Sequence, residues 1–211
     1  MGLDKKKPGC RSFFIFIFLA ILGCEKPLTS KVSPPATSQP NLAHWSTATP
    51  DNGFTDHFWD VTFGNGKFVA VGRGEIQTSS DGITWTSRSP AGGFSGDFFA
   101  VKYIGDKFLI VGASGEIQTS FDGITWTQQA ADNSYSQVFY TITTSDSLHV
   151  IAGENGEIQT SSDGITWTSR SAGGGYSGRF FHGSYGNSTF LLVGENSGVQ
   201  TSLDGISWEQ K

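Results

Sequence analysis

The sequence predicts an all-β protein made of four copies of one short unit, and three observations support this. The segment EIQTSSDGITWTSRS occurs at 75–89 and again, unchanged, at 157–171. Near-copies of its central part place an aspartate every 41 residues, at Asp81, Asp122, Asp163 and Asp204. The stretches between them are short and alternating or β-branched, and 28 of the 211 residues are glycine. This pattern is typical of strands separated by turns.

Each unit divides into four strands, expected in the first unit at 58–63, 67–71, 75–79 and 83–88. Asp81-Gly82 joins the last two strands, and Asp-Gly is a favoured two-residue hairpin turn because both positions take a positive φ. Pairing outward from this turn sets Thr78 opposite Trp85. Four-stranded units of 40–45 residues are typical of the blades of a β-propeller.

The predicted fold is therefore a β-propeller of four 41-residue, four-stranded blades plus one extra N-terminal strand. The propeller domain is expected at 44–211, with repeats at about 57–97, 98–138, 139–179 and 180–211.

The extra strand is predicted from HWSTATPDNGF at 44–54, which matches TWTSRSPAGGF at 84–94. Residues 44–49 thus have the pattern of an outermost strand whose own blade is missing. We expect a four-bladed ring or an open arc, with 44–49 at the seam beside the fourth repeat. The alternative is a homodimer in which two chains combine into an eight-bladed ring, because exposed strand edges favour pairing.

The motif Ser-x-Asp-Gly-x-Thr-Trp resembles the Asp-box (BNR) repeat of bacterial sialidases and related propellers, in a form one residue shorter. It is also similar to the propeller of the photosystem II assembly factors, and the resemblance covers residues 57–211. It implies that the four box aspartates accept hydrogen bonds from turn N–H groups, away from any active face. It also implies that four tryptophans pack between strands: Trp85, Trp126, Trp167 and Trp208.

The N-terminus has the pattern of a lipoprotein signal peptide at 1–23. Basic residues precede an apolar run, SFFIFIFLAIL, that is too short to span a bilayer, and ILGC follows it. ILGC resembles a lipobox, which implies that the Cys24 thiol carries the lipid. Residues 24–43 are rich in proline, serine and threonine and are expected to be a tether. We expect a lipid-anchored protein of the cell envelope, facing the periplasm or the surface.

Charge and composition narrow the partners. From Cys24 onward, ten basic residues face eighteen acidic ones, which argues against nucleic acid and against docking on anionic lipid by charge. The resemblance to sialidases would require a cluster of three arginines, yet Arg88 and Arg170 fall at one repeat position on the outermost strand. His149 and His182 lack metal-ligand spacing, and His149 replaces a strand phenylalanine and is expected to be packed. No catalysis, metal or cofactor is predicted.

The candidate binding face carries the turns between the second and third strands and the long loops between blades. Glu75, Glu116 and Glu157 share one repeat position there, and Phe94, Tyr135 and Tyr176 share another. Rings beside carboxylates suit sugars or cationic peptide groups. The alternative is that the aromatic residues fill gaps between blades and the glutamates form a solvated rim.

The expected function is a non-catalytic binding or scaffold module for an envelope or extracellular protein. The alternative is a sialidase-like lectin that binds a glycan without cleaving it.

The lipid anchor predicts the effect of replacing Cys24 by serine. The Cys24→Ser protein should remain unprocessed or become soluble, because acyl chains supply the membrane affinity. Membrane and soluble fractions of cells that express each form would test this. A serine variant that fractionates with membranes as the wild type does would contradict the anchor.

Overall fold

The computed structural model describes residues 47–211, which form four antiparallel sheets of four strands each. The first blade contains β1 (Phe58–Gly64), β2 (Lys67–Gly72), β3 (Ile76–Ser79) and β4 (Thr86–Arg88). The second contains β5 (Phe98–Ile104), β6 (Lys107–Gly112), β7 (Ile117–Ser120) and β8 (Thr127–Gln129). The third contains β9 (Phe139–Thr144), β10 (His149–Gly153), β11 (Ile158–Ser161) and β12 (Thr168–Arg170). The fourth contains β13 (Phe180–Gly186), β14 (Thr189–Gly194), β15 (Val199–Ser202) and β16 (Glu209–Gln210).

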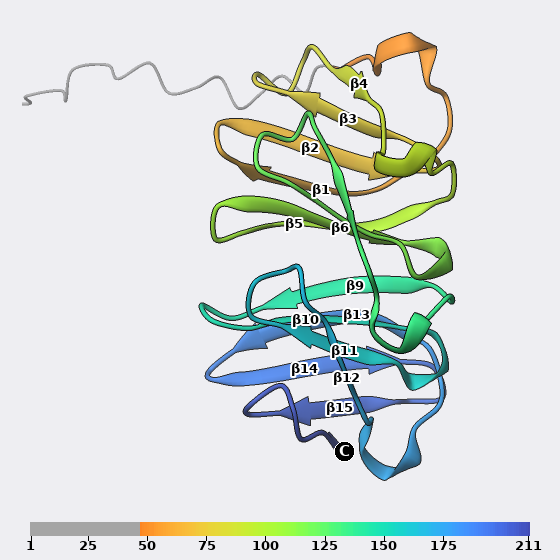
Figure 1. Cartoon of the computed structure of the whole chain (residues 1–211), viewed down its shortest axis with the longest axis vertical. Coiled ribbons are helices and arrows are strands. Elements are labelled where there is room, and N and C mark those ends of the chain that lie inside the picture. Colours follow the sequence, from red (N-terminus) through yellow and green to blue (C-terminus); the bar gives the residue numbers. More distant parts are fainter. Residues whose placement is uncertain (1–46) are drawn as a thin grey trace, which may run out of the picture. The chain divides into compact units, whose positions relative to one another are not determined.

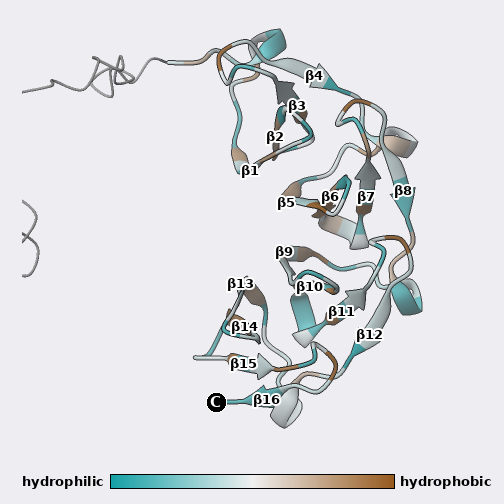
Figure 2. Ribbon diagram, turned by 90° about the vertical axis from the view of Figure 1, so that its left-hand side faces the viewer, coloured by the Kyte–Doolittle hydropathy of each residue, from teal (hydrophilic) through white to brown (hydrophobic). Residues whose placement is uncertain are grey.

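The four blades follow one another in chain order, as Figure 1 shows. Within each blade the strands pair in sequence order, so that each sheet is a simple meander. Figure 2 shows the blades fanned into an arc, with β1, β5, β9 and β13 on its inner side and β4, β8, β12 and β16 on its outer side. The arc stays open between β1 and β13. These features confirm the predicted propeller architecture of four four-stranded blades.

Apolar side chains are buried between consecutive blades rather than within one sheet. We call the packed interface between two consecutive blades a joint. In the first joint, Val69, Val71 and Ile76 of the first blade pack against residues of the second blade. Those partners are Phe98, Val101, Phe108, Ile110 and Trp126. The second and third joints repeat this arrangement with equivalent residues. All residues of β3, β7 and β11 are buried, so that these three strands show no alternation of exposed and buried positions.

The predicted hairpin register was wrong by one residue. Thr78 pairs with Thr86, and not with Trp85, so that β4 begins at Thr86. Gly82 has φ +73°, but Asp81 does not take the positive φ that a two-residue turn requires at both positions. The Asp81 carboxylate instead accepts the N–H groups of Ile83 and Thr84, which stabilises a wider turn.

The described part of the predicted extra N-terminal strand forms only an isolated bridge, and it lies elsewhere than expected. Of residues 44–49, only 47–49 are described, and they lie beside the first blade through a parallel bridge between Thr49 and Thr84. The prediction that this segment lies beside the fourth repeat is therefore corrected. The reason is that 47–57 is the linker into the first blade, and its 3-10 turn Asp51–Gly53 contacts that blade as every later linker contacts its own.

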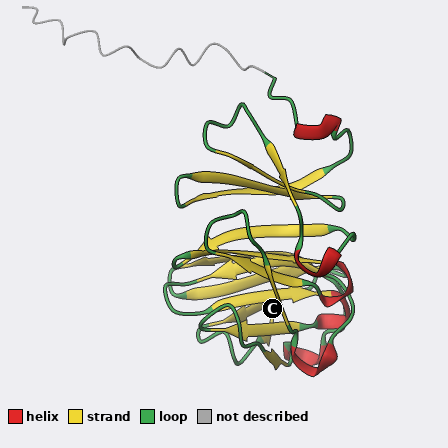
Figure 3. Cartoon of the chain, turned by 45° about the horizontal axis from the view of Figure 1, so that its top comes forward, coloured by secondary structure: helices red, strands yellow, loops and turns green. Residues whose placement is uncertain are grey.

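A buried glutamine fixes each linker to the blade that follows it. The Gln118 side chain is fully buried, and its Oε1 accepts the Ala91 N–H at 2.8 Å while its Nε2 donates to the Ala91 carbonyl at 3.3 Å. Three further glutamines make the same two bonds to their linkers: Gln77 with Asp51, Gln159 with Asp132 and Gln200 with Gly173. The linker turns lie along one edge of the blades (Figure 3).

The packing between blades predicts a large effect at Trp126, which is only 6% exposed. Trp126→Ala should lower the free energy of unfolding by about 3–5 kcal/mol, because it removes a large ring and leaves a cavity between two blades. Ile124→Ala, on the same turn but 42% exposed, should change it by about 0.5 kcal/mol or less. Urea unfolding followed by circular dichroism measures both. Equal losses in the two variants would contradict this account of the joint.

Candidate functional site

The four box aspartates hold the turn between the third and fourth strands of each blade. Asp163 Oδ1 accepts the N–H groups of Ile165 and Thr166, both at 2.8 Å, and the Ser161 hydroxyl at 2.9 Å. Asp81, Asp122 and Asp204 make the equivalent bonds. These bonds are the ones that the resemblance implied. They stabilise the charged carboxylate and lower the pKa of Asp81, Asp163 and Asp204 to about 2.

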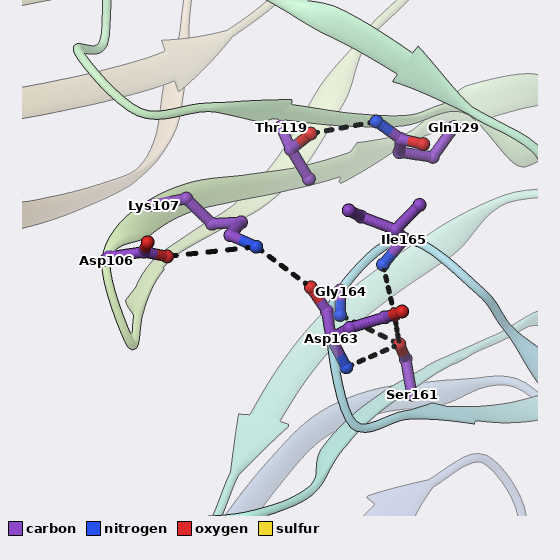
Figure 4. A network of polar contacts seen from close by, with 8 residues as sticks. All are labelled: Asp106, Lys107, Thr119, Gln129, Ser161, Asp163, Gly164 and Ile165. Carbon is purple, nitrogen blue, oxygen red and sulfur yellow. Dashed lines mark hydrogen bonds and ion pairs between the residues drawn. The ribbon is translucent and has the colours of Figure 1, made fainter.

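The box turn also contacts the preceding blade, as Figure 4 shows for the second and third blades. Lys107, in the β5–β6 hairpin, donates to the Asp163 carbonyl oxygen at 3.2 Å. In the joint before it, the Asn65 side-chain amide donates to the Phe121 carbonyl oxygen at 3.0 Å. The turns therefore stabilise both their own hairpins and the joints between blades.

The box tryptophans and His149 are packed, as the sequence predicted. Trp126, Trp167 and Trp208 are 5–7% exposed, and Trp85, which has no preceding blade within residues 47–211, is half-buried. His149 takes the position of Phe68, Phe108 and Phe190 and is buried, with its Nδ1 3.0 Å from Thr144 Oγ1. Burial disfavours the charged ring and lowers the pKa of His149.

The three glutamates of the predicted binding face are hydrogen-bonded within their own blades. Glu116 is 4% exposed; its Oε1 accepts from Gln118 at 2.6 Å and its Oε2 from Gln128 at 2.8 Å. Glu157 accepts from Gln159 at 2.8 Å and from Ser169 at 2.9 Å, and Glu75 accepts from Gln77 and Ser87. They bridge the third and fourth strands and orient the glutamine that holds the linker. They do not form a solvated rim.

The three aromatic residues predicted with them fill space between blades, as the alternative interpretation had it. Phe94, Tyr135 and Tyr176 each pack on the first residue of the next inner strand, with ring centroids 4.6–5.0 Å apart. The Tyr135 hydroxyl donates to the carbonyl oxygens of Val138 and Glu154. Burial and nearby carboxylates raise the pKa of Tyr135. Arg88 and Arg170 donate to Thr78 and Thr160 in their own blades, and Cys24 lies outside the described residues.

A different set of aromatic side chains lies on the inner side of the arc, two of them half-exposed and two partly buried. Trp59, Phe99, Tyr140 and Phe181, here called the aromatic row, take the second position of the four inner strands. Neighbouring rings are in contact, with centroids 5.9, 5.0 and 6.1 Å apart along the row. Trp59 is 49% and Phe181 50% exposed.

The aromatic row lines a groove of about 280 Å³ across all four blades. Polar and charged groups line it as well: Asp60, Lys102, Thr141 and His182. Nearby, the Tyr140 hydroxyl donates to Glu154 Oε1 at 3.3 Å, and Arg179 Nε lies 3.6 Å from carboxylate oxygens of both Glu154 and Glu195. Exposed rings beside carboxylates and bases can bind apolar, aromatic and charged groups of a ligand together.

Sequence reasoning missed the aromatic row although a signal for it exists. Every inner strand opens with two aromatic residues, in FW, FF, FY and FF. In each inner strand the second of these residues lies at a β-bulge and has no partner on the neighbouring strand. Because a bulge re-aims its side chain, the first ring enters a joint and the second faces the inner side of the arc. Among residues 47–211, no cluster of three His, Cys, Asp or Glu could hold a metal ion. In the same part of the chain, no helix has the length and apolar character needed to cross a membrane.

Comparison with known proteins gives the fold but no family. No family model matches the chain, and no curated protein matches its sequence. Among solved structures, YCF48 bound to D1 peptide has a TM-score of 0.58 at 20% identity, over 72% of this chain and 52% of that one. An ancestral GH74 enzyme has a TM-score of 0.58 at 15% identity, over 73% of this chain and 24% of that one. The computationally designed Ika8 protein has a TM-score of 0.57 at 10% identity, over 75% of this chain and 49% of that one. YCF48 and the GH74 enzyme are β-propellers. The chain spans about half of YCF48 and Ika8 and a quarter of the enzyme.

The lowered pKa of the box aspartates predicts loss of stability in acid. Because the folded pKa lies near 2 and the unfolded value near 3.9, the contribution is complete above about pH 4 and is lost as the pH falls toward 2. Asp163→Asn should lower the unfolding midpoint at pH 7 and reduce its fall between pH 4.5 and 2.5, both relative to wild type. Asp146→Asn, at an exposed site in the β9–β10 turn, should change neither. An unchanged acid profile for Asp163→Asn would contradict the role of the charge.

Proposed function

We propose that the chain is a non-catalytic binding module that holds a segment of a partner protein on the aromatic row. The observation that carries this proposal is the continuity of the row, in which four rings in contact cross all four blades and line one groove. Exposed Trp and Tyr rings supply large contact areas at a low cost in conformational entropy, as hot spots of protein interfaces do.

The environment of the groove suits a peptide with apolar and charged side chains. Lys102 and Asp60 line the groove, and the carboxylates of Glu154 and Glu195 lie near Tyr140, with Arg179 between them. One structural neighbour, YCF48, is described as bound to a peptide, and this supports the same class of ligand here. The partner is a protein of the cell envelope if Cys24 carries the lipid anchor predicted from the sequence.

A glycan is the second candidate ligand, because exposed Trp and Tyr rings can also stack on sugars. The rings at the ends of the row, Trp59 and Phe181, are half exposed and available for such stacking. A sialidase-like lectin without hydrolase activity is the form of this alternative that the sequence indicates.

The aromatic row predicts the effect of two substitutions on binding. Peptides selected by display on the purified chain, and proteins captured from envelope extracts, should bind Trp59→Ala and Tyr140→Ala about 10- to 100-fold more weakly than wild type. Phe121→Ala removes a ring that is 61% exposed on a box turn and serves as the matched control, with unchanged affinity. Calorimetry or surface plasmon resonance measures the affinities.

Two outcomes would overturn this assignment. Equal binding by the row variants and the Phe121 control would place the ligand elsewhere on the molecule. Binding on a glycan array that depends on Trp59 and Tyr140, with no peptide selected, would replace the protein ligand by a glycan.

A further inference from the structure

The two ends of the arc expose faces that every inner blade buries. Two apolar positions of the second strand are fully buried in each of the first three blades. One position holds Val69, Leu109 and Val150, and the other holds Val71, Val111 and Ala152. The fourth blade carries Leu191 and Val193 at these positions, and they are 37% and 38% exposed. The fourth blade thus keeps the apolar residues of a joint, although no further blade packs on this face within residues 47–211.

The first blade presents the opposite half of the same joint. Phe98, Phe139 and Phe180 open the other inner strands and are fully buried, whereas Phe58 at this position is 36% exposed. Val61 is 55% exposed, although its counterpart Val101 is fully buried. In the first joint, Val69 and Val71 pack against Phe98 and Val101. The two end faces are therefore complementary, because they carry residues at these same four positions.

The linker into the first blade has the form that a preceding blade would require. Phe54 packs on Phe58 at 4.8 Å, as Phe94, Tyr135 and Tyr176 do on their own inner strands. In the second and third joints, the corresponding linker also accepts a hydrogen bond from the turn of the blade before it: the Gly115 N–H donates to the Gln137 carbonyl oxygen and the Gly156 N–H to that of Gly178. Within residues 47–211 the linker at 47–57 has no such preceding blade.

We propose that two copies of this chain close head to tail into one ring of eight blades. The fourth blade of each copy packs on the first blade of the other, and the two joints are equivalent by two-fold symmetry. A head-to-tail contact forms a closed ring if the rotation between copies closes, and a filament if it does not. The four blades already follow a curved arc (Figure 2), which favours closure into a ring. Closure brings each Phe181 next to the Trp59 of the partner copy, so that the aromatic row runs around the whole ring. The proposal rests on the joints and is independent of what the row binds.

The polar contacts of the inner joints give this ring a specific register. Asn65, in the hairpin of the first blade, donates to the carbonyl oxygen of Phe121 in the box turn of the second. Asn187 holds the position of Asn65 in the fourth blade, with the same left-handed backbone (φ 48° and 45°), and Ser80 holds the position of Phe121 in the first. Asn187 of one copy should therefore lie beside Ser80 of the other.

Association of the full chain, with Cys10 and Cys24 replaced by serine to remove both native thiols, tests the joint. Sedimentation at micromolar concentration in mild detergent should report twice the 22.6 kDa of one chain. Leu191→Asp and Val61→Asp, at opposite ends, should each weaken the dimer about 100-fold or more. Ile165→Asp, 45% exposed in the third blade, is the matched control and should leave it intact. A mixture of the two end variants should regain weak association, because one of its two joints is then wild type on both sides.

Cross-linking tests the geometry independently of folding defects in the aspartate variants. In the same background, Asn187→Cys with Ser80→Cys should give a covalent dimer with a short bis-maleimide, and either cysteine alone should give none. A cross-link within one chain would show that four blades close by themselves, and a ladder of larger products would show a filament. Either result overturns the ring, as does a monomer at micromolar concentration or a dimer that both end variants leave intact.

Discussion

Each blade of this protein buries its apolar side chains against the blade beside it, and the rest of the structure depends on that constraint. A single four-stranded sheet of about 40 residues cannot enclose a core of its own, so that stability comes from the joints between blades. The three joints bury one set of residues three times over, including Phe98, Phe139 and Phe180. The same constraint leaves an unfilled half-joint at each end of the arc, where Val61 and Leu191 are exposed.

The strict copying of EIQTSSDGITWTSRS follows from the number of contacts that this segment makes. In the third blade, Ile158 and Trp167 enter joints, and Gln159 and Glu157 hold the linker. Ser161 and Asp163 form the box turn, and Thr160 accepts from Arg170. Most residues of the segment are used for architecture, and the inner strands, which differ more between blades, carry the aromatic row.

The candidate site therefore lies on the part of the repeat that varies. From the first blade to the fourth, the aromatic row carries Trp, Phe, Tyr and Phe. The residue that follows the ring is Asp in the first blade, Ala in the second, Thr in the third and His in the fourth. A scaffold of fixed joints with a variable inner side separates stability from recognition, because substitutions at the exposed rings leave the joints unchanged. The predicted binding face failed to meet this condition, since Glu116 orients the glutamine that holds the linker and Tyr135 packs in a joint.

The sequence by itself determined the number of blades, the strands within them and the turn-forming role of Asp81 and its repeats, because these depend on spacing and on contacts between residues close in the chain. It could not determine the hairpin register at Thr78, which depends on two further N–H groups bound by Asp81. Nor could it show that Glu116 is buried or that 47–49 lies beside the first blade, because contacts between distant segments decide both. Only the tertiary structure placed Trp59, Phe99, Tyr140 and Phe181 side by side, since residues about 40 positions apart become neighbours when the inner strands line the same side of the arc.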